Sequence, residues 1–552
     1  MADARAPEIG PQSQARVPGA WWAALAAASL VVATLVYAPS FAGGPISDDA
    51  MYLLNPWVTG LEPGSIGVVF DPRSQATLSL NNYAPLRAIA HAAQWRLLFD
   101  ETAIPLTNLS YHLTNVVAHV AASVLLALLL AQAGLSFGAA CAGSAFFLLH
   151  PANVEAVGWL CELWTSLALA LGIAALLAQR RRPALALVLF GLALLTKPQV
   201  VCVLPVALLR QRSWRRGSAS GAPGWGWMAG WIAVFAAVTV AELVTFFESA
   251  SAARTPLHPD PWVQARTIVA LAGRYLAMAV TGAGVGAFQQ PPAAVSWLDP
   301  WWLFGLAGSA AIAALALHAL RDGREEAAWW AWGPAAFLPV SQILPFLFPF
   351  ADRYLYFMLP GLVGAVLLAG RRVQIVGALP ARVWLAGAVL VCLAFGAWSH
   401  QRAGIWVSED RVLADAARRW PDGVPAHLLA ARRAAQAGDA GTAIAHLEIC
   451  RARGWDYYDY LLQHPAFAPI RPTAPFQELV RAFAGDAIER ASKTRRKTQL
   501  DWRDIAEAHR RRGEIAEAIR ALDQAVALGG PIDAEVRRSA DSLRAQLRAK
   551  GP

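Results

Sequence analysis

The first 400 residues of this chain contain few charged side chains. The whole chain of 552 residues contains 47 Lys and Arg and 38 Asp and Glu, or 15% charged residues. Soluble globular proteins average about a quarter. Only 40 of these 85 charges precede residue 401, and the other 45 lie in the last 152 residues. Together with the positive mean hydropathy of +0.39, this distribution argues against a soluble enzyme and predicts a membrane domain followed by a soluble domain.

Paired cysteines are also lacking. The five cysteines show no paired spacing, and only the last lies in the soluble part: Cys141, Cys161, Cys202, Cys392 and Cys450. This pattern supports neither a disulfide framework nor a thiolate metal site. The excess of nine positive charges is more typical of the cytoplasmic loops of a membrane protein than of a nucleic-acid-binding surface.

Uncharged runs long enough to cross about 30 Å of hydrocarbon recur between residues 21 and 398. The first, 21–38, is predicted to be a membrane helix rather than a signal peptide, because only a loose cleavage sequence follows it. The other predicted spans are 112–133, 136–149, 155–179, 183–196, 198–209, 225–247, 300–320, 327–349, 354–370 and 380–398. We therefore expect an all-α fold, with an N-terminal segment over 1–20, a membrane domain of about 11 spans over 21–400 and a soluble helical domain over 401–552.

The basic loops predict the orientation of these spans. With Arg5 and Arg16 in the cytoplasm, the later basic segments fall on the same side, at 180–182, 210–216, 321–324 and 371–372. This holds if the segment 263–285, which carries Arg266 and Arg274, is interfacial or re-entrant. The loop 39–111, with its amphipathic stretch 86–99, and the C-terminal domain are then exported, whereas a twelfth crossing would leave that domain in the cytoplasm. The Ala-, Arg- and Trp-rich composition favours a bacterial source, which would place the C-terminal domain in the periplasm beside an inner membrane; a lumen is the alternative.

The C-terminal domain contains one sequence template twice. Gly438-Asp-Ala-Gly-Thr-Ala443-Ile444-Ala-His-Leu447 matches Gly513-Glu-Ile-Ala-Glu-Ala518-Ile519-Arg-Ala-Leu522. In each copy a glycine ends one helix, an acidic residue opens the next, and Ala, Ile and Leu form a packing face. The template looks like tetratricopeptide repeats, which bind peptides or partner proteins; an ordinary bundle of helical hairpins is the alternative.

Two acidic features lie near the predicted exported surface. Asp48 and Asp49 follow the first span by about ten residues, and adjacent carboxylates can raise the pKa of one member, which suits a general base. His150-Pro151 precedes Glu155 and Glu162, whose spacing of seven predicts a shared helical face. Glu162 would then lie about 10 Å inside the membrane, where an acid is functional by default. A solvated turn and a buried structural pair are the respective alternatives.

Two cations are predicted near the same surface. Lys197 separates two apolar runs, and the 14 residues of 183–196 reach only about 21 Å as a helix. Lys197 is therefore expected below the surface, in a cavity open from outside, where a point cation suits a phosphate. Arg353 lies in Asp352-Arg353-Tyr354 and offers a planar fork for phosphate oxygens. Snorkelling of Lys197 and a plain Asp–Arg interfacial pair are the alternatives. Together the four features suit an anionic lipid-phosphate substrate and a hydroxyl acceptor.

In the order of these motifs the chain resembles the GT-C superfamily of membrane glycosyltransferases with C-terminal tetratricopeptide repeats, such as the transmembrane O-mannosyltransferases. The similar segments are Asp48-Asp49 with Asn55-Pro56, Tyr83-x-Pro85-Leu86, His112-Leu-x-Asn115-x-x-x-His119, His150-Pro151-x-x-x-Glu155-Ala156-Val157, Lys197-Pro198 with Leu204-Pro205, and Arg353-Tyr354-x-Tyr356. The chain departs from the family where Ala84 replaces an Arg, at Cys161-Glu162, and over 286–299.

The resemblance implies transfer of a sugar, with inversion, from a polyprenyl-phosphate carrier to a hydroxyl of an exported acceptor, expected to be a protein. Asp48 or Asp49 would be the base, and Lys197 and Arg353 would stabilise the departing phosphate. The expected site-shaping residues are His150, Glu155, Glu162, Tyr83 and His112. Because side-chain cations can neutralise a monophosphate, no cofactor or obligatory metal is expected, although a divalent metal stays open.

The expected partners are membrane lipids, the lipid-linked sugar and the acceptor protein, which the repeats would engage; nucleic acid is not expected. Three other functions remain open at this point. They are a transferase that modifies lipid-linked glycans or polysaccharides, a non-catalytic membrane-anchored repeat adaptor, and, more weakly, a transporter, for which inverted halves would be expected.

Overall fold

The structure is a computed structural model that describes residues 17–216, 223–250, 256–345, 348–372 and 381–549. Every regular element within these ranges is helical, which confirms the all-α prediction. Five helical segments are long and apolar enough to cross a membrane: Gly19–Ser40 (α1 with η1), Ile104–Gln132 (α6), Leu160–Ala178 (η4 with α9), Trp225–Glu248 (α12) and Pro300–Arg321 (α14). A sixth results if the bent pair α7 (Phe137–Leu149) with Pro151–Gly158 is one span.

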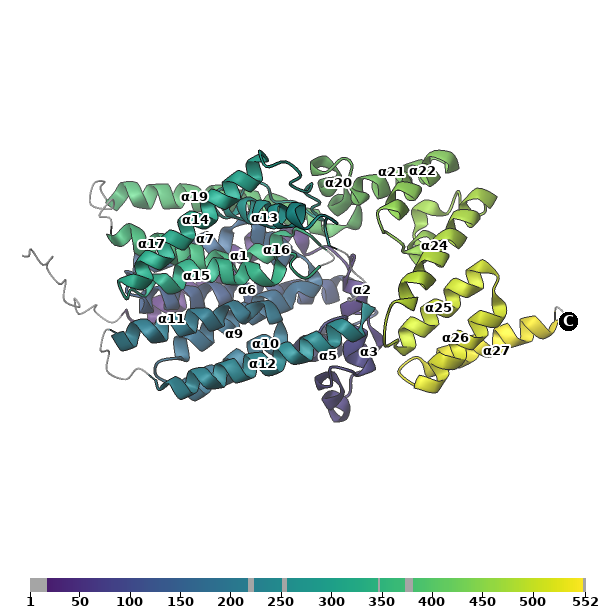
Figure 1. Cartoon of the computed structure of the whole chain (residues 1–552), viewed down its shortest axis with the longest axis horizontal. Helices are drawn as coiled ribbons and strands as arrows, with labels where there is room; N and C mark the ends of the chain where they lie inside the picture. Colours follow the sequence, from purple (N-terminus) through teal and green to yellow (C-terminus); the bar gives the residue numbers. More distant parts are fainter. Residues whose placement is uncertain (1–16, 217–222, 251–255, 346–347, 373–380, 550–552) are drawn as a thin grey trace, which may run out of the picture.

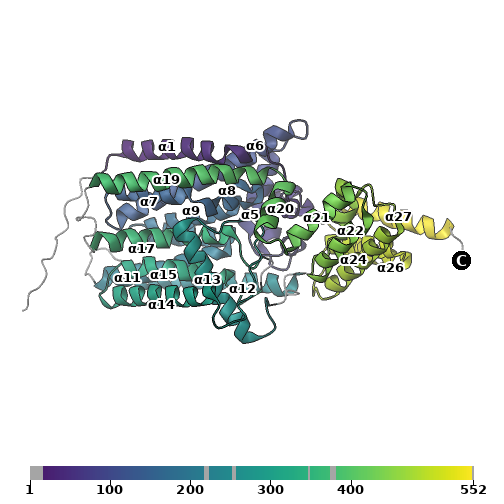
Figure 2. The same ribbon diagram turned by 90° about the horizontal axis from the view of Figure 1, so that it is seen from above.

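The apolar helices form a bundle with a buried centre. Within the tested windows of α6 and the η4–α9 segment, 61% and 72% of the residues are buried, against 11–17% for α1, α12 and α14. α6 packs on α7 and α9, and α10 (Pro183–Thr196) packs on α9 and α12. Figures 1 and 2 show these helices running alongside one another. The outer helices thus present apolar surface outward, as a hydrocarbon environment requires.

The bounds of several helices follow the uncharged runs of the sequence. α10, α12 and α14 agree with the predicted segments to within one residue, and α19 covers Ala381–Ala403. The amphipathic stretch 86–99 forms α5 (Pro85–Leu98), and 263–285 forms α13 (Pro261–Thr281), which is not among the candidate spans. The count of 11 spans stays a prediction, and Arg5 and Arg16, from which the orientation was derived, lie outside the described residues.

The segment predicted as one span over 155–179 is broken into α8 (Val154–Gly158), η4 (Leu160–Glu162) and α9 (Leu163–Ala178). Trp159 between α8 and η4 adopts an extended backbone conformation. The carbonyls released by this break are held by Asn115 of α6, whose side-chain amide lies within hydrogen-bonding distance of the carbonyls of residues 157, 159 and 160. A polar residue on the neighbouring helix therefore satisfies the backbone that an uninterrupted helix would have paired.

The predicted span 327–349 is also interrupted. α15 (Glu326–Phe337) is followed by the short η7 (Leu338–Val340), and the next helix, α16, covers Asp352–Leu355. Pro339 and Pro345 lie in this stretch, and proline lacks the amide hydrogen that a continuing helix needs. After α16, α17 runs over Leu359–Arg372. The remaining elements of the bundle are η5 (Pro198–Cys202) and α11 (Val203–Arg216).

The C-terminal domain is a series of helices packed in pairs. They are η8 (Gly404–Val407), α20 (Glu409–Arg419), α21 (Val424–Gln436), α22 (Ala440–Ala452), α23 (Tyr458–Gln463), η9 (Pro465–Phe467), α24 (Ala474–Ser492), α25 (Gln499–Arg512), α26 (Ile515–Leu528) and α27 (Asp533–Ala549). Gly438 and Gly513 have φ of +79° and +81° and separate α21 from α22 and α25 from α26. Both helix breaks predicted from the repeated template are therefore present, and the conformation favours glycine.

The C-terminal domain lies against the segment that joins α1 to α6. This segment contains α2 (Asp49–Tyr52), α3 (Pro56–Thr59), η2 (Pro63–Phe70), α4 (Gln75–Leu78) and α5. The Gln75 side chain donates to the carbonyl of Gly529 at 3.0 Å and accepts from the Gln499 amide at 2.8 Å. Figure 1 shows α2 and α3 at the end of the bundle next to α25.

The basic segments meet at the opposite end of the bundle, where α11 and α17 end in Figure 1. Arg210 pairs with Glu325 at 2.8 Å, and Arg216 donates to the Leu320 carbonyl at 3.1 Å. Arg371 donates to the Gly134 carbonyl. Segments far apart in the sequence thus place their arginines at one end, as expected if these loops share one side of a membrane.

Candidate functional site

The predicted acids and cations meet in one buried cluster at the end of the bundle nearest the C-terminal domain. It draws on α2, α8, η4, α16 and the turn between α10 and η5, through Asp49, Glu155, Glu162, Lys197 and Arg353. The four residues other than Lys197 are at most 5% exposed, and the Lys197 side chain is 12% exposed. Buried charges of this kind need partners, and each one here has them.

Glu162 is the centre of this cluster. Its Oε2 lies 3.2 Å from Lys197 Nζ and accepts a hydrogen bond from Trp164 Nε1 at 2.7 Å. The Thr165 hydroxyl also donates to Oε2 and lies 2.6 Å from Lys197 Nζ. The other oxygen, Oε1, lies 3.3 Å from Arg353 Nε. The two cations predicted to bind phosphate therefore contact the two oxygens of one carboxylate.

Glu155 fixes Arg353 from its other side. The Arg353 amide donates to Glu155 Oε2 at 2.9 Å, and the guanidinium pairs with Oε1. The guanidinium carbon also lies 5.1 Å from the ring centre of Trp159. Because the helix breaks at Trp159, the prediction that Glu155 and Glu162 share one helical face is wrong. The bend instead brings both acids to Arg353 from separate elements.

The two adjacent aspartates differ in their surroundings. Asp49 is fully buried, and its oxygens accept hydrogen bonds from the amides of Ile46 and Cys161, both at 2.8 Å. Burial raises the pKa of Asp49 to about 7, and the nearby charge of Asp48 contributes to this rise. Asp48, at the start of α2, is only half-buried. Asp49 therefore ties α2 to η4 beside Glu162, whereas Asp48 is the more accessible carboxylate.

Three predicted site-shaping residues support neighbouring segments instead. The Tyr83 hydroxyl donates to the Phe70 carbonyl at 3.1 Å, which closes the segment before α5. His112 Nε2 lies 3.3 Å from the Gly43 carbonyl oxygen, and His150 Nε2 lies 3.3 Å from the Ala279 carbonyl oxygen at the end of α13. These contacts place the three side chains in the segments that surround the cluster and not among its charged groups.

Arg87 was not predicted as a site residue. It lies on α5 and is 1% exposed, with its guanidinium carbon 3.8 Å from the Trp164 ring centre and 4.1 Å from that of Tyr52. Trp164 is the residue that donates to Glu162, so Arg87 borders the cluster. The only sequence feature that points to Arg87 as a site residue is its position in the amphipathic stretch just after Tyr83-x-Pro85.

A second missed feature joins the cluster to the C-terminal domain. Asp352, next to Arg353, accepts from the Gly286 amide at 2.8 Å and lies 4.0 Å from Arg402 at the end of α19. Arg402 also pairs with Asp415 of α20 at 3.2 Å, and Asp415 accepts from the Ala287 amide at 3.0 Å. The segment 286–299, which fitted the family poorly, thus takes part in this junction.

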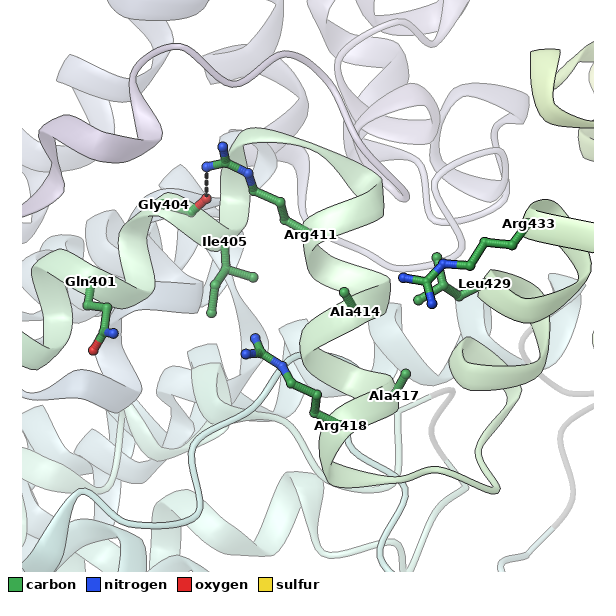
Figure 3. A pocket seen from close by; sticks show the side chains of 9 residues that line it. All are labelled: Gln401, Gly404, Ile405, Arg411, Ala414, Ala417, Arg418, Leu429 and Arg433. Atoms are coloured by element: carbon green, nitrogen blue, oxygen red, sulfur yellow. Dashed lines mark hydrogen bonds between the residues drawn. The ribbon is translucent and has the colours of Figure 1, made fainter. Parts of the chain in front are cut away.

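A cavity of about 620 Å³ lies near the same junction, between the end of α19, η8, α20 and α21 (Figure 3). Its lining includes Arg411, Arg418 and Arg433, and Arg411 donates to the Gly404 carbonyl at 2.9 Å. The cavity shares no residue with the charged cluster. Its arginines make it basic, but the predicted acids are absent from its lining, so the cluster is the candidate active site.

Among the described residues, no three or more His, Cys, Asp or Glu side chains are grouped so that they could hold a metal ion. The charged cluster contains carboxylates, which can transfer protons, and cations, which can bind anions. Compared with known proteins, the chain matches no family model, no curated protein and no solved structure.

Proposed function

We propose that this chain is an integral membrane glycosyltransferase of the GT-C type. It moves a sugar from a polyprenyl-phosphate carrier to a hydroxyl of an exported acceptor, in the first instance a protein. The observation that carries the proposal is the meeting of Lys197 and Arg353 on the two oxygens of Glu162, beside the tethered pair Asp48-Asp49. This is the combination of fixed cations and an acidic base that such a transfer requires.

In the proposed reaction Asp48 removes the proton of the acceptor hydroxyl. The hydroxyl oxygen then forms a bond to the anomeric carbon of the sugar, while the bond from that carbon to the phosphate oxygen breaks. The phosphate leaves with the bonding electrons, and a single displacement inverts the anomeric centre. Lys197 and Arg353 stabilise the charge on the departing phosphate, for which Glu155 and Glu162 hold them in place.

The two aspartates are not equally suited to this role. Asp49 is fully buried and its two oxygens accept hydrogen bonds from backbone amides, so an acceptor hydroxyl cannot reach it from the solvent. Asp48, in contrast, is half-buried, and its carboxylate is close enough to Arg353 for the two charges to attract each other. The raised pKa of Asp49, about 7, also favours one ionised carboxylate in the pair over two. We therefore assign Asp48 as the base and Asp49 as its positioning neighbour.

The topology that goes with this function has eleven crossings, with the basic end of the bundle in the cytoplasm. The charged cluster and the C-terminal domain then lie on the exported side of a bacterial inner membrane. The paired helices of the C-terminal domain, separated by Gly438 and Gly513, act as tetratricopeptide repeats that recruit the acceptor protein. The contacts of Gln75 with Gln499 and Gly529 support this role, because they hold the repeats next to the loop that carries the base.

Glycopeptide mass spectrometry of exported proteins tests the proposal. Cells would carry the wild type, a deletion, or the Asp48→Asn variant at matched protein level. We expect a hexose-type mass on exported peptides only with the wild type. Equal peptide spectra accompanied by altered lipid-linked glycans would favour a glycan-modifying transferase, and no change in either pool would favour a non-catalytic adaptor.

A truncation separates a protein acceptor from a glycolipid acceptor. A chain ending at residue 497 removes α25, α26 and α27 but keeps Arg402 and Asp415, which join the C-terminal domain to Asp352 beside the cluster. It also leaves the hydrophobic core formed by α21, α22 and α24 nearly complete. Loss of peptide glycosylation with intact turnover of a small hydroxyl acceptor would support recruitment by the repeats. Unchanged peptide glycosylation would contradict it.

A further inference from the structure

Arg87 is a buried cation with unused hydrogen-bond donors. Its side chain is 1% exposed, and one terminal nitrogen, Nη2, donates to Asn82 Oδ1 at 2.5 Å. The two other guanidinium nitrogens, Nε and Nη1, are buried and have no hydrogen-bond partner in good geometry, although the Tyr52 hydroxyl is close enough to favour the charged guanidinium. Within the described part of the chain, no carboxylate lies within ion-pair distance of this guanidinium.

Such an arrangement is costly unless something else compensates for it. An arginine stays charged even when buried, and a buried donor without a partner destabilises the folded protein. The rings of Tyr52 and Trp164, at 4.1 and 3.8 Å, offset part of this cost through their faces. The nearby Glu242 carboxylate accepts from the Tyr83 amide at 2.6 Å. Free donors at a buried, positively charged position are what an incoming anion would bind.

Arg87 also lies next to the cations already assigned. Lys197 Nζ is 4.7 Å from the centre of the Trp164 ring, the same ring on which Arg87 stacks. However, Lys197 is paired with Glu162, and Arg353 is paired with both Glu155 and Glu162. Arg87 is therefore the cation of this region whose charge no contacting carboxylate balances.

The proposed reaction creates one further negative charge on the phosphate, and Arg87 lies where it can interact with that charge. A lipid phosphodiester carries one negative charge, whereas the phosphate monoester released from it carries about −1.5 to −2 at pH 7. We propose that Arg87 binds the departing phosphate through Nε and Nη1 and stabilises the charge that develops as the bond to the sugar breaks. This inference rests on the proposed function, and it assigns to Arg87 a preference for the product phosphate over the donor.

Binding to the full-length protein in nanodiscs tests this assignment. The probes are a short-chain isoprenyl monophosphate, the corresponding isoprenyl methyl phosphodiester and the uncharged isoprenyl alcohol. We expect Arg87→Gln to weaken binding of the monophosphate at least tenfold, to weaken the phosphodiester less, and to leave the alcohol unchanged. Arg87→Lys, which keeps the charge but loses the planar fork, should fall between Arg87→Gln and the wild type.

Arg96→Gln is the matched control, because Arg96 lies on the same helix and pairs with the exposed Glu62. It should bind all three probes as the wild type does. Equal weakening of all three probes by Arg87→Gln would show that Arg87 only supports packing, and unchanged binding would show that it does not contact phosphate. Either outcome would overturn the assignment of Arg87 but not the proposed function. If the wild type binds neither anionic probe more tightly than the alcohol, the proposed function fails, and the role of Arg87 fails with it.

Discussion

Lys197 Nζ lies 3.2 Å from Glu162 Oε2, with the two side chains 12% and 3% exposed. The ion pair connects the turn after α10 to the start of the α9 segment, and the second oxygen of Glu162 reaches Arg353. Because one carboxylate sets the position of both cations, the phosphate of the proposed reaction would meet a preorganised site. It must also compete with Glu162 for the same donors, so the cluster favours the ligand with the higher negative charge.

Removing the charge of Glu162 should destabilise the protein. Glu162→Gln leaves Lys197 without its ion-pair partner and weakens the hold on Arg353, and breaking a buried pair from one side costs about 3 kcal/mol. Denaturant unfolding in detergent would measure this loss. Glu478→Gln is the control, because Glu478 pairs with Arg481 at an exposed position where a pair contributes under about 1 kcal/mol. Equal effects of the two substitutions would contradict the central role of Glu162.

Stability should fall as the pH rises through the range in which Asp49 titrates. Burial raises the pKa of Asp49 from 3.8 to about 7, so the folded protein holds this proton more tightly than the unfolded chain. The resulting penalty on folding appears above about pH 4 and is complete above about pH 7, where it reaches about 4 kcal/mol. Thermal unfolding of the wild type and Asp49→Asn between pH 4 and 9 checks this.

The Asp49→Asn variant should gain stability relative to the wild type as the pH rises, because asparagine does not titrate. Its absolute stability should be lower at pH 4, since the amide can accept a hydrogen bond with only one of its two polar atoms. Asp541→Asn, at an exposed pair with Arg544, should follow the wild type at every pH. Parallel curves for the wild type and Asp49→Asn would refute the raised pKa.

Asp48→Asn and Asp49→Asn should affect different properties, turnover in the first case and folding in the second. Loss of a positioned general base lowers turnover by typically 10²–10⁴-fold, so we expect this loss for Asp48→Asn without a large change in unfolding. Asp49→Asn should instead act on folding, lowering the folded fraction at pH 4 and less so as the pH rises, with turnover per folded molecule within about tenfold of the wild type. Measurement of kcat with a lipid-linked sugar and a hydroxyl acceptor, normalised to folded protein, separates the two. The reverse pattern would exchange the assigned roles.

Much of the helical architecture could be predicted from the sequence. The uncharged runs gave α10, α12 and α14 nearly to the residue, because hydropathy over a helix length is a local property. The breaks at Trp159 and after Val340 could not be read in this way. They depend on a polar partner on another helix, Asn115, and on prolines inside an otherwise apolar run.

The sequence predicts which residues form the candidate site better than it predicts the contacts between them. Asp49, Glu155, Glu162, Lys197 and Arg353 stood out as charges in apolar surroundings, and the structure brings them together. Arg87 did not stand out, because an arginine in an amphipathic helix normally faces solvent. Its burial depends on the rings of Tyr52 and Trp164, which come from other elements.

The junction with the C-terminal domain should stabilise the candidate active site. Asp415 of α20 accepts from Arg402 at 3.2 Å and from the Ala287 amide at 3.0 Å, and Arg402 lies 4.0 Å from Asp352. Asp415→Ala should therefore leave Arg402 with a single acidic neighbour and release the segment at 286–287. We expect it to lower the free energy of unfolding by about 2 kcal/mol and to expose the segment between η8 and α21 to limited proteolysis.

A double-mutant cycle that combines Asp415→Ala with Arg402→Gln tests whether the loss of stability arises from the contact between these two residues. Residues in direct contact show interaction energies of about 0.5–3 kcal/mol, so the two substitutions together should cost less than the sum of their separate effects. Asp541→Ala with Arg402→Gln is the control, because Asp541 lies on α27 and pairs with Arg544, and that pair should be additive. If Asp415 and Arg402 were also additive, the C-terminal domain would be held by other contacts, such as those of Gln75, and Asp352 would be positioned by the membrane domain alone.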